Sequence, residues 1–133
     1  MSTFLKINKN IGSYNQKITI AGDKSLSIRW VLLASQAQGS SKAYNLLISE
    51  DVIAALDSIK KLGVRVRVHK NYCEIYGNGI NSFQYKKNLT IDAKNSGTFG
   101  RLMLGLLIKS PQKIKLIGDK SLSKRDFLRV TLP

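Results

Sequence analysis

An eight-residue stretch occurs twice in this chain of 133 residues, and the repeat limits the folds that the chain can adopt. Residues 22–29 read GDKSLSIR and residues 118–125 read GDKSLSKR, so the copies differ only in Ile28 against Lys124. Each copy follows a strand pattern and precedes a helix pattern. The repeat therefore predicts two equivalent units in which one kind of turn joins a strand to a helix. The alternative is that Gly-Asp-Lys-Ser is ordinary turn chemistry that recurs by chance.

Three segments, at about residues 49–62, 26–38 and 97–109, have the apolar periodicity of helices. In the first, Ser49 is a candidate N-cap and Gly63 a candidate stop. For the third, Asn95 is the candidate N-cap. The predicted apolar faces are Val52, Ala55, Leu56 and Ile59 in the first helix, Leu26, Trp30, Leu33, Ala34 and Ala37 in the second, and Phe99, Leu102, Met103, Leu106 and Leu107 in the third.

Apolar residues that alternate with polar ones predict strands between these helices. The expected strands cover residues 17–20, 42–47, 64–68, 73–75, 89–91 and 114–116, and another helix opens near Ser121. The order β-α-β-α-β-β spans residues 17–77 and restarts at about residue 88. We therefore expect an α/β (α+β) fold of about one and a half repeated units: a complete unit at 17–77 and a truncated one at 88–133. This division predicts that residues 1–133 are a fragment of a longer protein.

The formal net charge of +14 has two interpretations, a nucleic-acid-binding protein or a protein that handles small anionic ligands. Basic residues occur singly or in pairs, and aromatic residues do not alternate with them as in a base-stacking platform. A hydrophobic content of 43% argues against intrinsic disorder. With one cysteine and one histidine, disulfide frameworks and multi-cysteine zinc sites are excluded. No apolar run approaches a membrane span and no signal peptide is recognisable, so we expect a soluble, cytoplasmic protein.

The first copy of the repeat has the chemistry of an anion site. Gly22 permits a sharp turn, and unpaired backbone N–H groups at a helix start attract negative charge. Lys24 adds a cation and Ser25 a hydroxyl donor. Arg29 lies four residues after Ser25, so that both project from one helix face and together suit a carboxylate or phosphate. The spacing is not that of a P-loop.

A second candidate site is NSGTFGR at residues 95–101, which also lies between a strand and a helix. Asn95, Ser96 and Thr98 present hydrogen-bonding side chains, and Gly97 allows a ligand to approach the backbone. A third candidate pairs Ser121 with Arg125, at the spacing of Ser25 and Arg29. All three follow the carboxyl ends of predicted strands, so we expect them on one side of the sheet, around a ligand with more than one negative charge.

These stretches resemble, in order and spacing, three signatures of the 5-enolpyruvylshikimate-3-phosphate synthase family (3-phosphoshikimate 1-carboxyvinyltransferases). The first signature corresponds to GDKSLSIRWVLLASQAQGSSKAYNLLISEDVIAALDSIKKLGV, the second to NSGTFGRLMLGLL and the third to GDKSLSKR. The resemblance covers nearly the whole chain. It implies the inside-out α/β fold of enolpyruvyltransferases, with repeated β-α-β-α-β-β units. It also implies transfer of the enolpyruvyl group of phosphoenolpyruvate to the 5-hydroxyl of shikimate 3-phosphate, with release of phosphate.

The resemblance also implies roles for individual residues and no metal or organic cofactor. The residues that would bind shikimate 3-phosphate are Lys24, Ser25 and Arg29, those that would bind phosphoenolpyruvate are Lys24, Gly97 and Arg125, and the supporting residues are Asp51, Asn95, Thr98 and Arg101. Lys24 would also assist proton transfer. The family's remaining site residues lie in its later half, so the isolated fragment is expected to be inactive. The full-length protein would be a monomer that binds neither nucleic acid nor membrane.

Two departures from the family pattern stand near these residues. Asp126 occupies the place of a usual proline after Arg125, where a carboxylate would partly neutralise the arginine. Gly100 lies inside the predicted third helix, at a cost of about 1 kcal/mol relative to alanine. Two alternatives therefore stay open: a basic nucleic-acid-binding domain, or a diverged, non-catalytic anion-binding relative.

Overall fold

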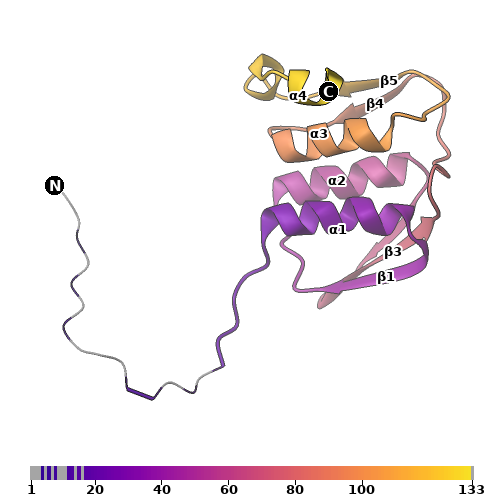
Figure 1. Cartoon of the computed structure of the whole chain (residues 1–133). Coiled ribbons are helices and arrows are strands. Elements are labelled where there is room, and N and C mark those ends of the chain that lie inside the picture. The colour runs from indigo at the N-terminus through magenta and orange to yellow at the C-terminus, as the bar shows by residue number, and fades with distance from the viewer. Residues whose placement is uncertain are drawn as a thin grey trace.

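Helices and strands alternate along the chain in the computed structural model, which describes residues 17–132 and residues 4, 6, 8, 12, 13 and 15. The three longer helices, which lie side by side in Figure 1, are α1 (Lys24–Gln36), α2 (Glu50–Lys61) and α3 (Gly97–Leu106). The strands are β1 (Gln38–Tyr44), β2 (Arg65–Val68), β3 (Tyr72–Asn78), β4 (Leu89–Asp92) and β5 (Ile114–Ile117). A short 3-10 helix, η1 (Leu122–Lys124), and a single-turn helix, α4 (Leu128–Thr131), follow β5.

Two separate sheets share one hydrophobic core. The first sheet is antiparallel, in the order β1-β3-β2, and the second consists of β4 and β5 in parallel. Helix α1 packs against α2, α3 and β3, so it connects the two halves of the described chain. The fully buried side chains of the common core include Ile28, Val31, Val52, Ile59, Ile75, Ile91, Phe99 and Met103. Each such side chain stabilises the fold by roughly 1.5–3 kcal/mol relative to an exposed position.

Helix α2 confirms the sequence prediction most fully. Its predicted apolar face, Val52, Ala55, Leu56 and Ile59, is buried. Ser49 occupies the N-cap position, although its side chain makes no capping hydrogen bond. Gly63 follows the helix with φ of 86°, a conformation that glycine adopts readily.

The predicted face of α1 is only partly correct: Ala34 is buried and Trp30 packs against the core, but two of the predicted leucines do not. Leu26 and Leu33 are 66% and 70% exposed, whereas Ile28, Val31 and Leu32 are buried. Helix α1 carries apolar residues on several sides, so periodicity alone could not distinguish the face that meets α2 and β3.

The predicted strand at residues 17–20 does not form. These residues have no regular secondary structure, and Ile18 and Ile20 are 65% and 74% exposed. The backbone groups of a strand need a neighbouring strand as hydrogen-bond partner. The hydrogen bond found here comes instead from a side chain, from Asn45 Nδ2 to the Ile20 carbonyl at 2.9 Å. The next strand was predicted at 42–47 and lies at 38–44, because β1 takes its register from β3 and lacks a clear apolar alternation.

Both copies of the repeat form the same local structure. In the first, Asp23 Oδ1 accepts a hydrogen bond from the Leu26 N–H at 2.7 Å. In the second, Asp119 Oδ1 accepts one from the Leu122 N–H at 2.6 Å. The residue after each of these leucines donates its N–H to the carbonyl of the same aspartate, at 3.0 and 2.9 Å. The copies are therefore structurally equivalent turns, as the repeat predicts, although one starts the 13-residue α1 and the other the three-residue η1.

Candidate functional site

The parallel pairing of β4 and β5 brings together segments that are far apart in sequence. Beyond the strands, the Ala93 N–H donates to the Ile117 carbonyl and the Asp119 N–H donates to the Lys94 carbonyl, both at 2.8 Å. These bonds place the loop before α3 beside the second copy of the repeat. Asn95 therefore lies next to Asp119, and its Nδ2 donates to Asp119 Oδ2 at 2.7 Å.

A polar cleft of about 380 Å³ lies where this loop meets the start of α1. Its lining residues are Lys24, Asp51, Asn95, Ser96, Gly97, Thr98, Arg101 and Arg125. Three are cations and one is a carboxylate, so the cleft favours an anionic ligand. The cleft thus brings together one cation from each of the three candidate sites: Lys24, Arg101 and Arg125.

The ammonium group of Lys24 pairs with the carboxylate of Asp51. Lys24 Nζ lies 2.9 Å from Asp51 Oδ2, and the side chains are 52% and 15% exposed. Asp51 stands in the first turn of α2, where the helix dipole favours a carboxylate. The pair therefore directs a half-exposed lysine towards the cleft.

Arg101 is held from two sides by the segment after η1. Its Nη2 donates to the carbonyl of Asp126 at 2.8 Å, and its guanidinium lies 5.1 Å from the centroid of the Phe127 ring. The Nε of Arg101 is buried and has no hydrogen-bond partner within the described part of the chain. The arginine is thus positioned without an ion pair to a carboxylate among the described residues.

Arg125 is held by neutral oxygens. Its Nη2 donates to Asn95 Oδ1 at 2.8 Å and lies 3.4 Å from Ser121 Oγ, so the predicted Ser121–Arg125 contact is present. A Cβ atom at Gly97 would lie 3.2 Å from one Nη of Arg125 and 2.8 Å from one Nη of Arg101. The absence of a side chain at Gly97 therefore leaves room for both guanidinium groups.

The expectations for Asn95 and Asp126 need correction. The N-cap of α3 is Ser96, whose Oγ accepts from the Phe99 N–H at 3.3 Å, and not Asn95, which faces Arg125. The Asp126 carboxylate accepts the Leu128 N–H at the start of α4, and the described residues show no ion pair between it and Arg125, contrary to the expectation. Gly100 is buried against the Phe127 ring, and a Cβ there would lie 3.4 Å from the ring carbons. The two departures from the family pattern therefore belong to one local packing arrangement.

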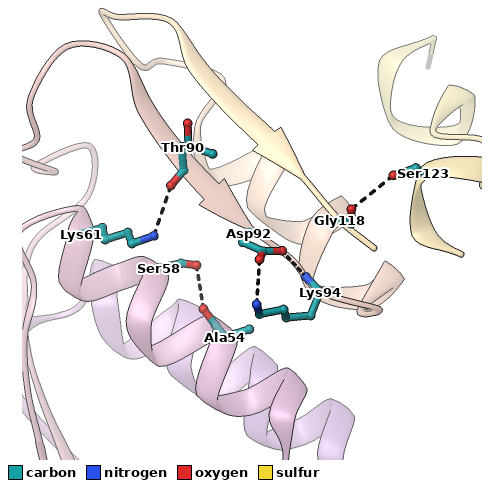
Figure 2. A network of polar contacts seen from close by, with 8 residues as sticks. All are labelled: Ala54, Ser58, Lys61, Thr90, Asp92, Lys94, Gly118 and Ser123. Atoms are coloured by element: carbon teal, nitrogen blue, oxygen red, sulfur yellow. Dashed lines mark hydrogen bonds and ion pairs between the residues drawn. The ribbon is translucent and has the colours of Figure 1, made fainter. Parts of the chain in front are cut away.

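A second charged cleft, of about 420 Å³, lies between α2 and β4 (Figure 2). Its cations already have partners. Lys94 Nζ pairs with Asp92 at 2.9 Å, Lys60 Nζ pairs with Asp57 at 3.1 Å, and Lys61 Nζ lies 3.4 Å from the Thr90 carbonyl. The Lys94 hydrogen bonds hold the pKa of Asp92 below its usual value, and Asp92 raises the pKa of Lys94. This cleft is consequently less suited to an anion than the first.

Ser25 and Arg29 stand apart from the residues that line the first cleft. Ser25 is half-buried and Arg29 is exposed, one helical turn further along α1. Sequence reasoning missed Asp119 and Phe127, which hold Asn95 and Arg101. The equivalence of Asp119 with Asp23 in the repeat is the signal that could have identified Asp119.

Comparison with known proteins identifies the family to which this site belongs. The family model described as EPSP synthase (3-phosphoshikimate 1-carboxyvinyltransferase) matches residues 9–131. The chain belongs to the EPSP synthase family. A relative from Bacillus cytotoxicus, named 3-phosphoshikimate 1-carboxyvinyltransferase, is 42% identical over 119 residues, which are 90% of this chain and 28% of the relative. A relative of the same name from Streptococcus mutans is 36% identical over 129 residues, or 97% of this chain and 30% of the relative.

The structural comparison agrees with this assignment. EPSP synthase from Acinetobacter baumannii has a TM-score of 0.76 and 34% sequence identity, over 87% of this chain and 26% of that one. The predicted α/β (α+β) fold of an enolpyruvyltransferase is therefore confirmed. The chain spans less than a third of the length of these EPSP synthase relatives. Family membership does not favour the alternative of a nucleic-acid-binding domain.

Two further observations apply to the residues that the structure describes. No helix among them has the length and apolar character needed to cross a membrane. Nor do they contain a cluster of three or more histidine, cysteine, aspartate or glutamate side chains with the geometry of a metal site. His69 is exposed and stacks on the ring of Tyr72, and Cys73 is buried in the core.

Proposed function

We propose that this chain supplies part of the active site of a 3-phosphoshikimate 1-carboxyvinyltransferase. The reaction joins the 5-oxygen of shikimate 3-phosphate to the enolpyruvyl group of phosphoenolpyruvate. The bond between that group and the phosphate oxygen breaks, and inorganic phosphate leaves. Family membership supports the reaction class, and the polar cleft supports the placement of the site.

Phosphoenolpyruvate carries a phosphate and a carboxylate, so its site needs more than one cation. In this proposal Lys24, Arg101 and Arg125 bind these groups, and Gly97 keeps the space between the guanidinium groups open. Guanidinium groups suit both phosphate and carboxylate oxygens because they present paired donors in a plane. Thr98 lines the same cleft with a neutral hydroxyl.

Shikimate 3-phosphate is assigned to the neighbouring surface of α1. Ser25 and Arg29 lie one turn apart on this helix, next to Lys24. Lys24 thus stands between the two proposed substrates, where its ammonium group would contact both and assist proton transfer. The Asp51 carboxylate, 2.9 Å from Lys24 Nζ, would keep the ammonium group oriented during these steps.

The observation that carries the proposal is the convergence of three cations on one cleft, with one carboxylate among them. It is tested by grafting residues 9–131 of this chain, the segment that the family model matches, into the full-length Bacillus cytotoxicus relative in place of the corresponding segment. We expect the graft to release phosphate when both substrates are present. Lys24→Ala or Arg125→Ala in the graft should abolish turnover.

Lys60→Ala provides the matched control, because Lys60 lies in the second charged cleft. It should leave phosphate release near the level of the parent graft. Wild-type kinetics for Lys24→Ala or Arg125→Ala would refute the assignment. The 133-residue chain alone should show no steady phosphate release, since it covers 28–30% of the length of these relatives.

A further inference from the structure

The side-chain amide of Asn95 lies between a carboxylate and a guanidinium group. Its Nδ2 donates to Asp119 Oδ2 at 2.7 Å, and its Oδ1 accepts from Arg125 Nη2 at 2.8 Å. An amide has one donor end and one acceptor end, so a partner that only accepts determines which end faces the guanidinium. We propose that Asp119 is a positioning residue that acts through Asn95 to hold Arg125 in the cleft. This inference rests on the proposed function, in which Arg125 binds phosphoenolpyruvate.

Asp119 is itself firmly held. Its backbone N–H donates to the Lys94 carbonyl at 2.8 Å, and its Oδ1 accepts the Leu122 N–H at 2.6 Å. The hydrogen bond from Leu122 is the largest cause that lowers the pKa of Asp119, and the Asn95 amide lowers it further. The carboxylate therefore stays ionised at neutral pH and has no proton to donate to Asn95. This keeps the amide oxygen of Asn95 towards Arg125.

The first copy of the repeat contains a natural control for this arrangement. Asp23 caps the Leu26 N–H at 2.7 Å, as Asp119 caps that of Leu122 at 2.6 Å. The hydrogen bonds of the described residues include no side-chain amide bound to Asp23. Substitution of Asp23 therefore measures the effect of an altered helix cap and of one lost negative charge, while the partners of Asn95 stay unchanged.

Asn is the informative replacement because it caps a helix about as well as Asp. In Asp119→Asn, the amide oxygen keeps the Leu122 N–H, and the new NH₂ group then faces the NH₂ group of Asn95. Two donors cannot bond, so Asn95 turns over and presents its own NH₂ group to Arg125. The guanidinium then loses its acceptor and leaves its position. In Asp23→Asn, no such donor–donor contact arises.

The experiment has one readout without ligand and one with substrate. In the full 133-residue chain, ¹⁵N spectra of the Arg125 guanidinium are compared for the parent, Asp119→Asn and Asp23→Asn. In the grafted enzyme, the KM for phosphoenolpyruvate is measured for the same variants. We expect Asp119→Asn alone to shift the Arg125 signals and to raise KM about three- to tenfold, the size of one lost hydrogen bond to a charged group in a partly exposed site. The turnover number should change little.

The direction of the change in KM distinguishes a positioning role of Asp119 from a simple electrostatic effect of its charge. Removal of a negative charge by itself would strengthen the binding of an anion and lower KM. In an Asn95→Ala background, which lacks the connecting amide, Asp119→Asn should raise KM no further. Unchanged Arg125 signals together with an unchanged or lower KM in Asp119→Asn would overturn the proposal. An unchanged KM for phosphoenolpyruvate in Arg125→Ala would refute the proposed role of Arg125 in binding this substrate. The spectra would still decide whether Asp119 positions the Arg125 side chain.

Discussion

Lys24 and Asp51 form an ion pair, with 2.9 Å between Nζ and Oδ2, that joins the first turn of α1 to the first turn of α2. The carboxylate is largely buried and the ammonium group half-exposed. The pair therefore holds the first turns of α1 and α2 together at the edge of the polar cleft.

Asp51→Asn should lower the free energy of unfolding by about 0.5–1 kcal/mol, because it removes a partly exposed ion pair and a favourable helix-dipole charge. Urea unfolding of Asp51→Asn, Lys24→Ala and the double variant would measure the coupling energy, which should shrink at high salt. The control is the pair Lys60–Asp57, at 3.1 Å and about half-exposed on both sides, for which we expect weaker coupling. Equal coupling in the two pairs would contradict this prediction.

Substitution by alanine should have different effects at two glycines of α3. Gly100→Ala should stabilise the chain by up to about 1 kcal/mol, because alanine favours a helix and its Cβ would touch the Phe127 ring at an ordinary 3.4 Å. Gly97→Ala should change stability little, since its tight contacts would be with the side-chain ends of Arg101 and Arg125, and its contact with Leu122 at 3.8 Å is an ordinary one. It should instead raise the KM for phosphoenolpyruvate in the grafted enzyme, because both guanidinium groups must move.

Thermal unfolding and substrate titration of the two variants test this pair of expectations. Phe127→Leu and Phe127→Tyr extend it, since only the tyrosine keeps a ring beneath Arg101. The tyrosine variant should keep the parent KM, and the leucine variant should raise it about two- to fivefold, the range of a surface cation–π interaction. An increase in KM for Gly100→Ala but not for Gly97→Ala would show that the geometry has been misinterpreted.

The sequence predicted the parts of the fold that depend on local chemistry. The apolar face and charged ends of α2 and the turns of the repeat all follow from short-range patterns. Periodicity could not choose the buried face of α1, because the choice depends on the packing against α2 and β3. The strand at residues 17–20 failed for a similar reason, since no described strand pairs with it.

The cleft was predictable only in outline. The sequence predicts the three candidate sites on one side of a single sheet; the structure has two sheets and no strand before the first site, yet Lys24, Arg101 and Arg125 line one cleft. The sequence did not show that the Asp126 carboxylate accepts the Leu128 N–H, or that Phe127 packs against Gly100. Both contacts depend on the path of the chain after η1, which no local pattern determines.

Stability should depend on the ionisation of Glu74, a buried carboxylate on β3. Ser40 Oγ donates to it at 2.6 Å and the Tyr76 hydroxyl at 2.8 Å, and these bonds, Ser40 first, lower its pKa from the usual 4.5. Because the pKa is lower in the folded state, the stabilisation is complete above the unfolded value and is lost as the pH falls through the folded value. The free energy of unfolding should therefore decrease below about pH 4.5.

Urea unfolding between pH 7 and pH 3 would test this dependence. Glu74→Gln should flatten the acid branch of the stability curve, that is, the decrease in the free energy of unfolding below about pH 4.5. Ser40→Ala should move the Glu74 carboxyl titration towards its usual pKa in ¹³C spectra. Part of the acid branch should survive in Glu74→Gln, because Asp92 and Asp119 also have lowered pKa values. An acid branch of the same slope in Glu74→Gln and the parent would refute the assignment to Glu74.

Gly22 and Gly118 occupy equivalent places in the repeat but differ in what surrounds them. A Cβ at Gly22 would overlap the carbonyl oxygen of Asn45 and lie 2.8 Å from the backbone nitrogen of Leu47. A Cβ at Gly118 would meet only the side chain of Leu122, whose outer carbons can adjust but whose Cβ, at 2.9 Å, can separate only by a small shift of η1. We expect Gly22→Ala to lower the free energy of unfolding by about 2–3 kcal/mol and Gly118→Ala by about 1 kcal/mol.

The physical reason is that backbone atoms cannot move aside without breaking other contacts. The loop that faces Gly22 is tied to α1 by the hydrogen bond from the Leu47 N–H to Ser27 Oγ at 3.1 Å. Alanine at position 22 should therefore also expose the Leu47 amide. Faster hydrogen exchange at that amide would directly report the separation of the loop from α1. A larger loss of stability in Gly118→Ala than in Gly22→Ala would mean that close approach of the loop does not explain the glycine at position 22.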